Sequence, residues 1–239
     1  MKRIFILVFV LIAACARDHH STSTTVSRPQ PKPSAVPASL EIVTLGDSLA
    51  YGAGDEVDGG IANRVKAELR ARGVATVRTT NLGMNGAQTS DVIDRLKQER
   101  IRNALKDADA IVLSVGANDL FRTPNAQQQV LKNPVGVAKR ILDRLQTIVK
   151  ELHTINPTAR ILLLGGYNPV PDHQWAPMID QYLTMWDASV AARFENDPLV
   201  SIVTMSDIVT ARRLSRYDHF HPGAEAYQEA SKRIATMLL

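Results

Sequence analysis

The chain has 239 residues, of which 45% are hydrophobic and 22% are charged, a balance typical of globular proteins with a hydrophobic core. The net charge of +4 comes from basic residues that are scattered rather than clustered, and aromatic residues make up only 5% of the chain, so we expect no nucleic-acid partner. Cys15 is the single cysteine, which excludes an internal disulfide bond.

The first residues have the pattern of a bacterial export signal. Lys2 and Arg3 precede an unbroken apolar run over residues 4–12, which is shorter than the roughly 20 residues needed to span a bilayer. The sequence Leu-Ile-Ala-Ala-Cys that ends at Cys15 resembles the lipobox of bacterial lipoproteins. The resemblance implies a lipoprotein signal peptide over residues 1–14, a lipid on Cys15, and an extracytoplasmic protein anchored to a membrane of the cell envelope. The alternative is an ordinary signal peptide whose cleavage releases a secreted protein.

Residues 15–38 form a distinct segment that follows this signal. They contain many Ser, Thr and Pro residues and almost nothing apolar to bury. This composition predicts a disordered, partly extended linker, because such a segment cannot form a packed core. The remaining residues, 39–239, are numerous enough for one compact domain.

The domain alternates between short apolar runs and longer amphipathic segments. The short runs predict strands over residues 40–45, 74–80, 110–115, 160–164 and 200–204. Apolar residues at helical spacing predict helices over residues 61–73, 89–105, 134–152, 178–194 and 224–239. Apolar strands separated by helices indicate a parallel sheet covered on both faces. We therefore expect an α/β fold, a three-layer α/β/α sandwich of about five parallel strands, with its site at the carboxyl ends of the strands.

Polar residues suited to acyl transfer follow several of these strands. Ser48 comes after the first strand, Gly86 after the second and Asn118 after the third, while Asp218 and His221 precede the last helix. Acyl transfer needs a nucleophile, a base, a group that orients the base, and hydrogen-bond donors for an oxyanion. An imidazole such as that of His221 is the most common general base in enzymes, and Asp218 is close enough in the chain for one loop to deliver both groups.

Four sequence blocks resemble the motifs of the SGNH, or GDSL-type, hydrolases. They are Gly46-Asp47-Ser48-Leu49, the segment around Gly86, Gly116-Ala117-Asn118-Asp119, and Asp218-His219-Phe220-His221. The blocks occur in the order that the family has, and the resemblance extends from near residue 40 to the end of the chain.

This resemblance implies a flavodoxin-like SGNH hydrolase fold and a serine esterase that needs neither a cofactor nor a metal ion. It implies a catalytic triad of Ser48, Asp218 and His221. It also implies an oxyanion hole made by the backbone N–H groups of Ser48 and Gly86 and the side-chain amide of Asn118.

The expected reaction is hydrolysis of a carboxylic ester, such as an acyl ester, a lysophospholipid or a similar lipid, through an acyl-enzyme intermediate. One alternative is a carbohydrate O-deacetylase that acts on cell-wall or extracellular glycan. Another is a non-catalytic surface lipoprotein that binds such molecules. The expected partner is therefore a small-molecule, lipid or glycan ester, and the chain is assumed to be a monomer.

Several of these residues also have a purely structural interpretation. Ser48 could cap the helix that follows it, and Gly86 and Asn118 could be turn residues. We expect Asp47 and Asp119 to brace loops rather than to take part in the chemistry.

The histidines and the tryptophan-containing segment leave further alternatives. His219 is a rival for the base, whereas His153 and His173 have no carboxylate at a useful sequence spacing and are expected to be structural. The segment 167–186, which includes Trp175, either lines an acyl pocket or packs on the sheet. We expect packing for its helical residues and leave Trp175 open.

Overall fold

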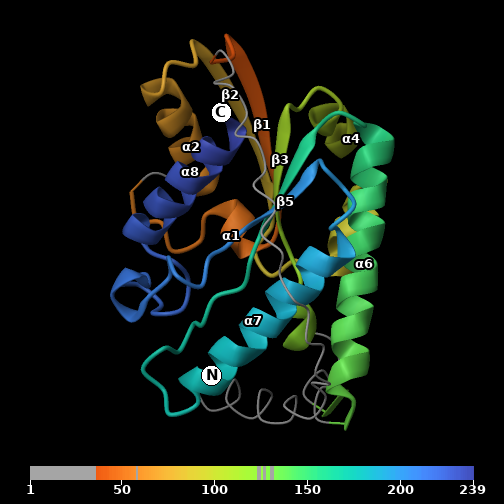
Figure 1. Cartoon of the computed structure of the whole chain (residues 1–239), viewed down its shortest axis with the longest axis vertical. Coiled ribbons are helices and arrows are strands. Elements are labelled where there is room, and N and C mark those ends of the chain that lie inside the picture. Colours follow the sequence, from red (N-terminus) through yellow and green to blue (C-terminus); the bar gives the residue numbers. More distant parts are fainter. Residues whose placement is uncertain (1–35, 58, 123–124, 126–127, 130–131) are drawn as a thin grey trace, which may run out of the picture.

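The computed structural model describes residues 36–239 apart from 58, 123–124, 126–127 and 130–131. The expected signal peptide, Cys15 and nearly all of the expected linker lie outside the described residues. The described chain folds around a five-stranded sheet with strand order β2-β1-β3-β4-β5, in which all neighbouring strands are parallel (Figure 1). The strands are β1 (Ser39–Gly46), β2 (Thr76–Gly83), β3 (Ala110–Ser114), β4 (Arg160–Leu164) and β5 (Val200–Val203).

Helices cover both faces of this sheet (Figure 1). One face is covered by α2 (Ile61–Ala71) and α8 (Ala224–Leu238), which pack against each other. The other face is covered by α3 (Thr89–Arg95), α4 (Glu99–Leu105), α6 (Pro134–Ile155) and α7 (Ala176–Arg193). This is the three-layer α/β fold with five parallel strands that the sequence predicts. Within the described residues, no helix combines the length and the apolar character needed to cross a membrane.

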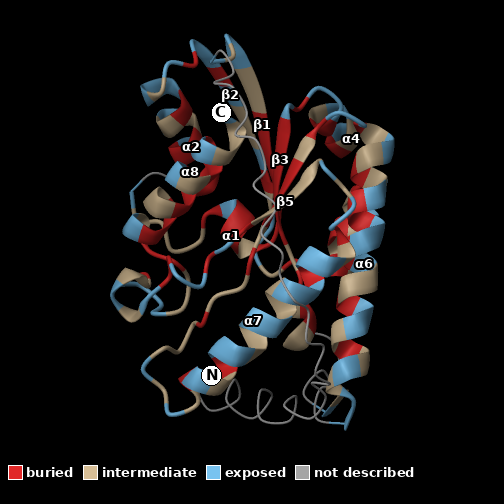
Figure 2. Cartoon of the chain, viewed as in Figure 1, coloured by how far each residue is buried: buried red, intermediate tan, exposed pale blue. Residues whose placement is uncertain are grey.

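The central strands β3 and β4 are almost entirely apolar because helices cover them on both sides, whereas the edge strand β2 contains polar residues such as Arg78 and Asn81. All residues of β3 are buried, and Figure 2 shows the buried positions gathered where the strands meet the helices. In β1, Val43 and Leu45 pack with α3, α4 and α6, whereas Ile42 packs with α2 and α8. The alternation of side chains along each strand therefore divides the interior into two hydrophobic cores, one on each face of the sheet.

The single helix predicted over residues 89–105 is wrong, because the structure has two helices, α3 and α4, with a turn between them. The backbone N–H groups of Ile101 and Arg102 donate to the carbonyl of Gln98, which starts the second helix. Leu96 and Ile101 are both buried in the same core. Their spacing would put them on different faces of a continuous helix, so the turn at residues 96–98 brings both side chains inward.

The carboxyl ends of the strands meet at one edge of the sheet, where the connecting loops are gathered. Helix α1 (Ser48–Tyr51) follows β1 at this edge, and the short 3-10 helix η1 (Ala117–Leu120) follows β3. The segment between β5 and α8 contains a second 3-10 helix, η2 (Ala211–Arg213), and returns to the same region beside α1 (Figure 1). The fold thus brings the loops that carry the predicted site residues to one rim.

Candidate active site

Ser48 is the first residue of α1 and lies at a sharp turn from strand to helix. Gly46 has φ of 126°, and a β-carbon at this position would overlap the carbonyl oxygen of Ser114 on the neighbouring strand. Asp47 is the N-cap of α1, and its carboxylate accepts a hydrogen bond of 3.0 Å from the backbone N–H of Leu49. The cap is therefore Asp47, which leaves the hydroxyl of Ser48 available for another partner.

That partner is His221, which is also bound to Asp218. The Nε2 atom of His221 lies 2.9 Å from the Ser48 hydroxyl, and its Nδ1 atom lies 2.6 Å from a carboxylate oxygen of Asp218. A carboxylate can only accept, so Nδ1 donates to Asp218, and this leaves Nε2 as the ring nitrogen that can accept the Ser48 O–H. Burial raises the pKa of Asp218, but hydrogen bonds from the His221 side chain and from two backbone N–H groups outweigh it, so the pKa lies below its usual value.

The loop that carries His221 is anchored on both sides. The backbone N–H of Ser215 donates to the carbonyl of His221 at 2.8 Å, and the hydroxyl of Tyr167, which follows β4, donates to the carbonyl of Phe220 at 3.1 Å. Burial, followed by nearby negative charge, raises the pKa of Tyr167 far above its usual range, so this hydroxyl remains a donor. His219, the rival base, is exposed, and its backbone has φ of 51°. The histidine that hydrogen-bonds to Ser48 is His221.

Gly86 and Asn118 meet in the loops that follow β2 and β3. The backbone N–H of Met84 donates to the carbonyl of Gly46 at 2.8 Å, which ties the Gly86 loop to the turn before the serine. The side-chain amide of Asn118 donates to the carbonyl of Ala87 at 3.1 Å. In the part of the chain that the structure describes, the second hydrogen of this amide has no acceptor. An amide held by one hydrogen can present the other to a substrate atom.

The two aspartates expected to brace loops do so. Asp47 accepts a hydrogen bond of 2.7 Å from the Ser114 hydroxyl and is buried beneath α1. Burial raises its pKa from 3.8 to about 6, although hydrogen bonds from Ser114 and Leu49 partly offset the effect. Asp119 accepts from both the backbone N–H and the hydroxyl of Thr89, at 2.8 and 2.5 Å, and so fixes the start of α3 to η1.

His153 has no carboxylate at a useful sequence spacing, but the fold gives it a carboxylate partner that is distant in the chain. Its Nε2 atom lies 2.8 Å from the carboxylate of Asp197, which is distant in sequence but close in the fold. This pair joins the end of α6 to the segment before β5, so the role of His153 is structural, as expected. His173 makes an edge-to-face contact with Trp175 and accepts a backbone hydrogen bond from it at the start of α7.

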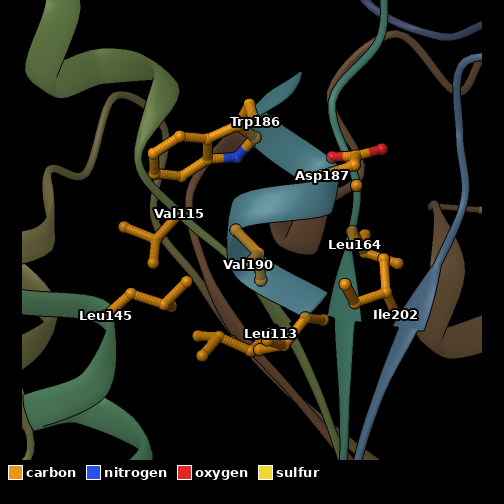
Figure 3. Close-up of a pocket in the computed structure, with 10 residues that line it drawn as sticks. Leu113, Val115, Leu145, Leu164, Trp186, Asp187, Val190 and Ile202 are labelled. Atoms are coloured by element: carbon orange, nitrogen blue, oxygen red, sulfur yellow. The ribbon is translucent and has the colours of Figure 1, made fainter. Parts of the chain in front are cut away.

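Helix α7 packs on the sheet over a small apolar cavity. Figure 3 shows Trp186 and Val190 of α7 facing Leu113 and Leu145 across this cavity, with the carboxylate of Asp187 at its side. Burial raises the pKa of Asp187, which accepts from the backbone N–H of Gly166. Trp186 packs against the core under α6 and against a small separate cluster formed by Val137 and Ile141. Trp186 therefore packs, as predicted for the helical residues of segment 167–186, whereas Met185 in the same helix is exposed.

Three residues near the site were missed by the sequence analysis. Ser114 is the single hydroxyl in an apolar strand, and that contrast with its neighbours was a usable signal. Tyr167 and Arg122 have no comparable local signal, because their positions depend on contacts between distant loops. Within the described residues, no three His, Cys, Asp or Glu side chains come together as a possible metal site.

The fold and the hydrogen-bonded series Asp218, His221 and Ser48 are features of α/β ester hydrolases that use a serine. The chain belongs to the GDSL-like Lipase/Acylhydrolase family, whose family model matches residues 44–229. The protein is therefore a GDSL-type ester hydrolase, as its sequence predicts, and its substrate is an ester.

Similar proteins support the same fold. YpmR of Bacillus subtilis is 27% identical over 203 residues, which are 82% of this chain and 80% of YpmR. The lipase Lip_vut3 from a goat rumen metagenome superposes with a TM-score of 0.69 at 20% identity, over 82% of this chain and 96% of the lipase. A catalytic mutant of Axe2, an acetylxylan esterase from Geobacillus stearothermophilus, superposes with a TM-score of 0.62 at 17% identity, over 83% of this chain and 94% of the esterase.

Proposed function

We propose that Ser48 is the nucleophile of this ester hydrolase, with His221 as its base and Asp218 as the group that orients the base. The observation that carries this proposal is the continuous series of hydrogen bonds, 2.6 Å from Asp218 to His221 and 2.9 Å from His221 to Ser48. A serine hydroxyl is a weak nucleophile until a base takes its proton, and these distances suit direct transfer.

The reaction would proceed in two steps. The oxygen of Ser48 attacks the ester carbonyl as its proton moves to His221, and Asp218 stabilises the resulting imidazolium. The oxyanion is held by the backbone N–H groups of Ser48 and Gly86 and the free amide hydrogen of Asn118. The imidazolium then protonates the leaving alcohol, which gives an acyl-serine. Water, deprotonated by His221, releases the acid and restores the enzyme.

We propose that the substrate is an acyl ester with a substantial apolar part. Three large apolar side chains are exposed near the proposed catalytic residues, with exposed fractions of 52% for Tyr51, 38% for Met84 and 80% for Tyr217. Tyr51 follows Ser48 by one helical turn, Met84 lies in the Gly86 loop, and Tyr217 directly precedes Asp218. We call these three side chains, Tyr51, Met84 and Tyr217, the exposed apolar rim. Exposed apolar side chains next to a polar site suit an amphiphilic ester better than a sugar acetate.

A series of p-nitrophenyl esters, from acetyl to dodecanoyl, tests both proposals on the full chain. We expect kcat/KM to rise from acetyl to medium chains, and Ser48→Ala to remove turnover of all of them. A maximum at acetyl, with activity on acetylated glycan, would instead favour the deacetylase alternative. Turnover by Ser48→Ala equal to that of the wild type would exclude Ser48 as the nucleophile.

We also propose that the protein is a lipoprotein, held at the bacterial envelope through Cys15. The support is the order of basic, apolar and small residues that ends at this cysteine. Expression of the full chain with radiolabelled fatty acid should label the wild type but not Cys15→Ser, and the variant should leave the membrane fraction. A labelled Cys15→Ser protein, or one that stays in the membrane fraction, would contradict the anchor.

A further inference from the structure

Arg122 lies against the backbone of Gly86, one of the proposed oxyanion donors. Arg122 comes soon after η1, and its backbone N–H donates to the carbonyl of Asn118 at 2.8 Å. Its guanidinium occupies the space that a β-carbon at Gly86 would need, and Gly86 has φ of 77°. The cation is therefore placed between the two loops that carry proposed oxyanion donors.

The Arg122 side chain is exposed, and its guanidinium has no hydrogen-bond or ion-pair partner within the described part of the chain. Other arginines of this protein are used to fasten the fold through carboxylates. Such pairs are Arg64 with Asp55, Arg193 with Asp143, and Arg233 with Asp207. An unpaired guanidinium at the site differs from these, because it keeps all of its donors available for a ligand.

We propose that Arg122 binds an anionic group, a phosphate or a carboxylate, on the ester substrate. The proposal rests on the proposed function, because it assumes that the ester carbonyl lies at Ser48, Gly86 and Asn118. Because the guanidinium lies against Gly86, a carbonyl held by the Gly86 N–H would have a substituent within its reach. Arginine suits this role because its planar fork pairs with two oxygens of a phosphate or carboxylate at once.

The exposed apolar rim makes phosphate on a lipid the favoured source of this charge. A lysophospholipid carries an acyl chain for the rim and a phosphate a few bonds from the ester carbonyl. An acidic glycan or a dicarboxylic acid ester would supply a carboxylate to the same guanidinium without the chain. The two sources can be separated by substrates that differ in a single charged group.

The test compares kcat/KM for paired substrates on the full chain. The phosphate pair is 1-myristoyl lysophosphatidic acid and 1-myristoyl glycerol, and the carboxylate pair is p-nitrophenyl hemisuccinate and p-nitrophenyl butyrate. We expect the wild type to prefer the phosphate ester, and Arg122→Gln to lower the phosphate-to-neutral ratio by about tenfold. Arg122→Lys should restore part of the ratio, since lysine keeps the charge but cannot form the bidentate hydrogen bonds of a guanidinium. A preference for the carboxylate ester alone would support the anion site but overturn phosphate as its ligand.

Arg100→Gln is the matched control, because Arg100 is exposed on α4 at the opposite edge of the sheet (Figure 1). It makes the same change of charge far from the site and should leave both ratios unchanged. An unchanged ratio in Arg122→Gln would overturn the proposal. So would an equal loss on charged and neutral esters, which would mean that Arg122 supports the oxyanion or the loop rather than recognising substrate.

Binding separates this proposal from the proposed function. Ser48→Ala should bind lysophosphatidic acid more tightly than the neutral monoglyceride, and the double variant Ser48→Ala, Arg122→Gln should lose that difference. If Ser48→Ala still hydrolysed esters, the nucleophile would be wrong while the binding comparison would still decide the role of Arg122. If Ser48→Ala bound both lipids equally, the anion site would be excluded even with Ser48 correct.

Discussion

Two histidine–aspartate pairs in this protein have nearly the same geometry but different surroundings. His221 and Asp218 are 2.6 Å apart and reach the Ser48 hydroxyl, whereas His153 and Asp197 are 2.8 Å apart between α6 and β5. A histidine with a carboxylate is therefore not a catalytic signal by itself. The hydroxyl at the other ring nitrogen distinguishes the two pairs.

This contrast gives a controlled test of the triad. Asp218→Asn should lower kcat by about 10⁴, because an amide favours the wrong tautomer of His221 and cannot stabilise the imidazolium. Asp197→Asn makes the same chemical change in the other pair and should leave kcat near the wild-type value. Steady-state kinetics measure kcat for both variants. An equal decrease of kcat in Asp218→Asn and Asp197→Asn would argue against a special role for Asp218.

The buried carboxyl of Asp47 makes a prediction about pH and stability. Its folded pKa of about 6 lies above the ordinary value of 3.8, so the folded state binds this proton more tightly than the unfolded state. The resulting stabilisation is complete below the unfolded pKa and is lost as the pH rises through the folded pKa. Asp47→Asn has no such charge, so its unfolding free energy relative to wild type should increase by about 2 to 3 kcal/mol between about pH 4 and about pH 8.

Urea unfolding of both proteins across this pH range measures the effect. Asp109→Asn, which changes a carboxylate on the exposed loop before β3, serves as the control. A difference between Asp47→Asn and wild type that stays constant with pH would contradict a raised pKa.

At the scale of elements, the turn from β1 to α1 depends on the absence of a side chain at Gly46. Gly46→Ala should destabilise the fold by at least about 3 kcal/mol, because it adds both strain at positive φ and overlap with the backbone of β3. Gly59→Ala also has positive φ, but its β-carbon meets only the end of the Asn63 side chain, at 3.2 Å. Thermal unfolding should show a much smaller loss for Gly59→Ala, and equal losses would show that overlap with β3 is unimportant.

The sequence predicted helices and strands well where a local apolar pattern marks them. It predicted them less well where contacts between distant residues determine the boundary of an element. Mostly apolar runs identified β1 and β3 because a strand covered on both faces leaves few polar positions. The break between α3 and α4 had no Gly or Pro to mark it, and its cause is the shared core that both helices enter. The pairing of Asp47 with Ser114 likewise requires the two strands to be adjacent, which single-strand patterns do not show.

The candidate site was more predictable than these contacts. Three of the residues, Ser48, Gly86 and Asn118, each follow a strand whose end is visible in the sequence, and a parallel sheet brings such ends to one edge. His221 was placed by its position just before the last predicted helix. Arg122 was not predictable in this way, because its side chain reaches across to a different loop.

At the scale of the whole molecule, one sheet joins two cores, and we expect them to unfold together. Ile234 is buried in the core under α2 and α8, and Leu152 in the core under α6. Both tryptophans, Trp175 and Trp186, lie at α7, on the side of Leu152. Ile234→Ala and Leu152→Ala should each cost about 2 to 5 kcal/mol and shift circular dichroism and tryptophan fluorescence equally. An unfolding transition in tryptophan fluorescence that Ile234→Ala did not shift would show that the two cores unfold separately.

The order of the site residues along the chain has a consequence for the synthesis of the enzyme. Ser48 and His221, whose side chains meet, are 173 positions apart, and α8 after His221 packs on α2 near the beginning of the domain. A ribosome therefore makes the proposed nucleophile long before its base. A chain that ends before His221 carries the serine without its imidazole, so we expect such a chain to hydrolyse no ester.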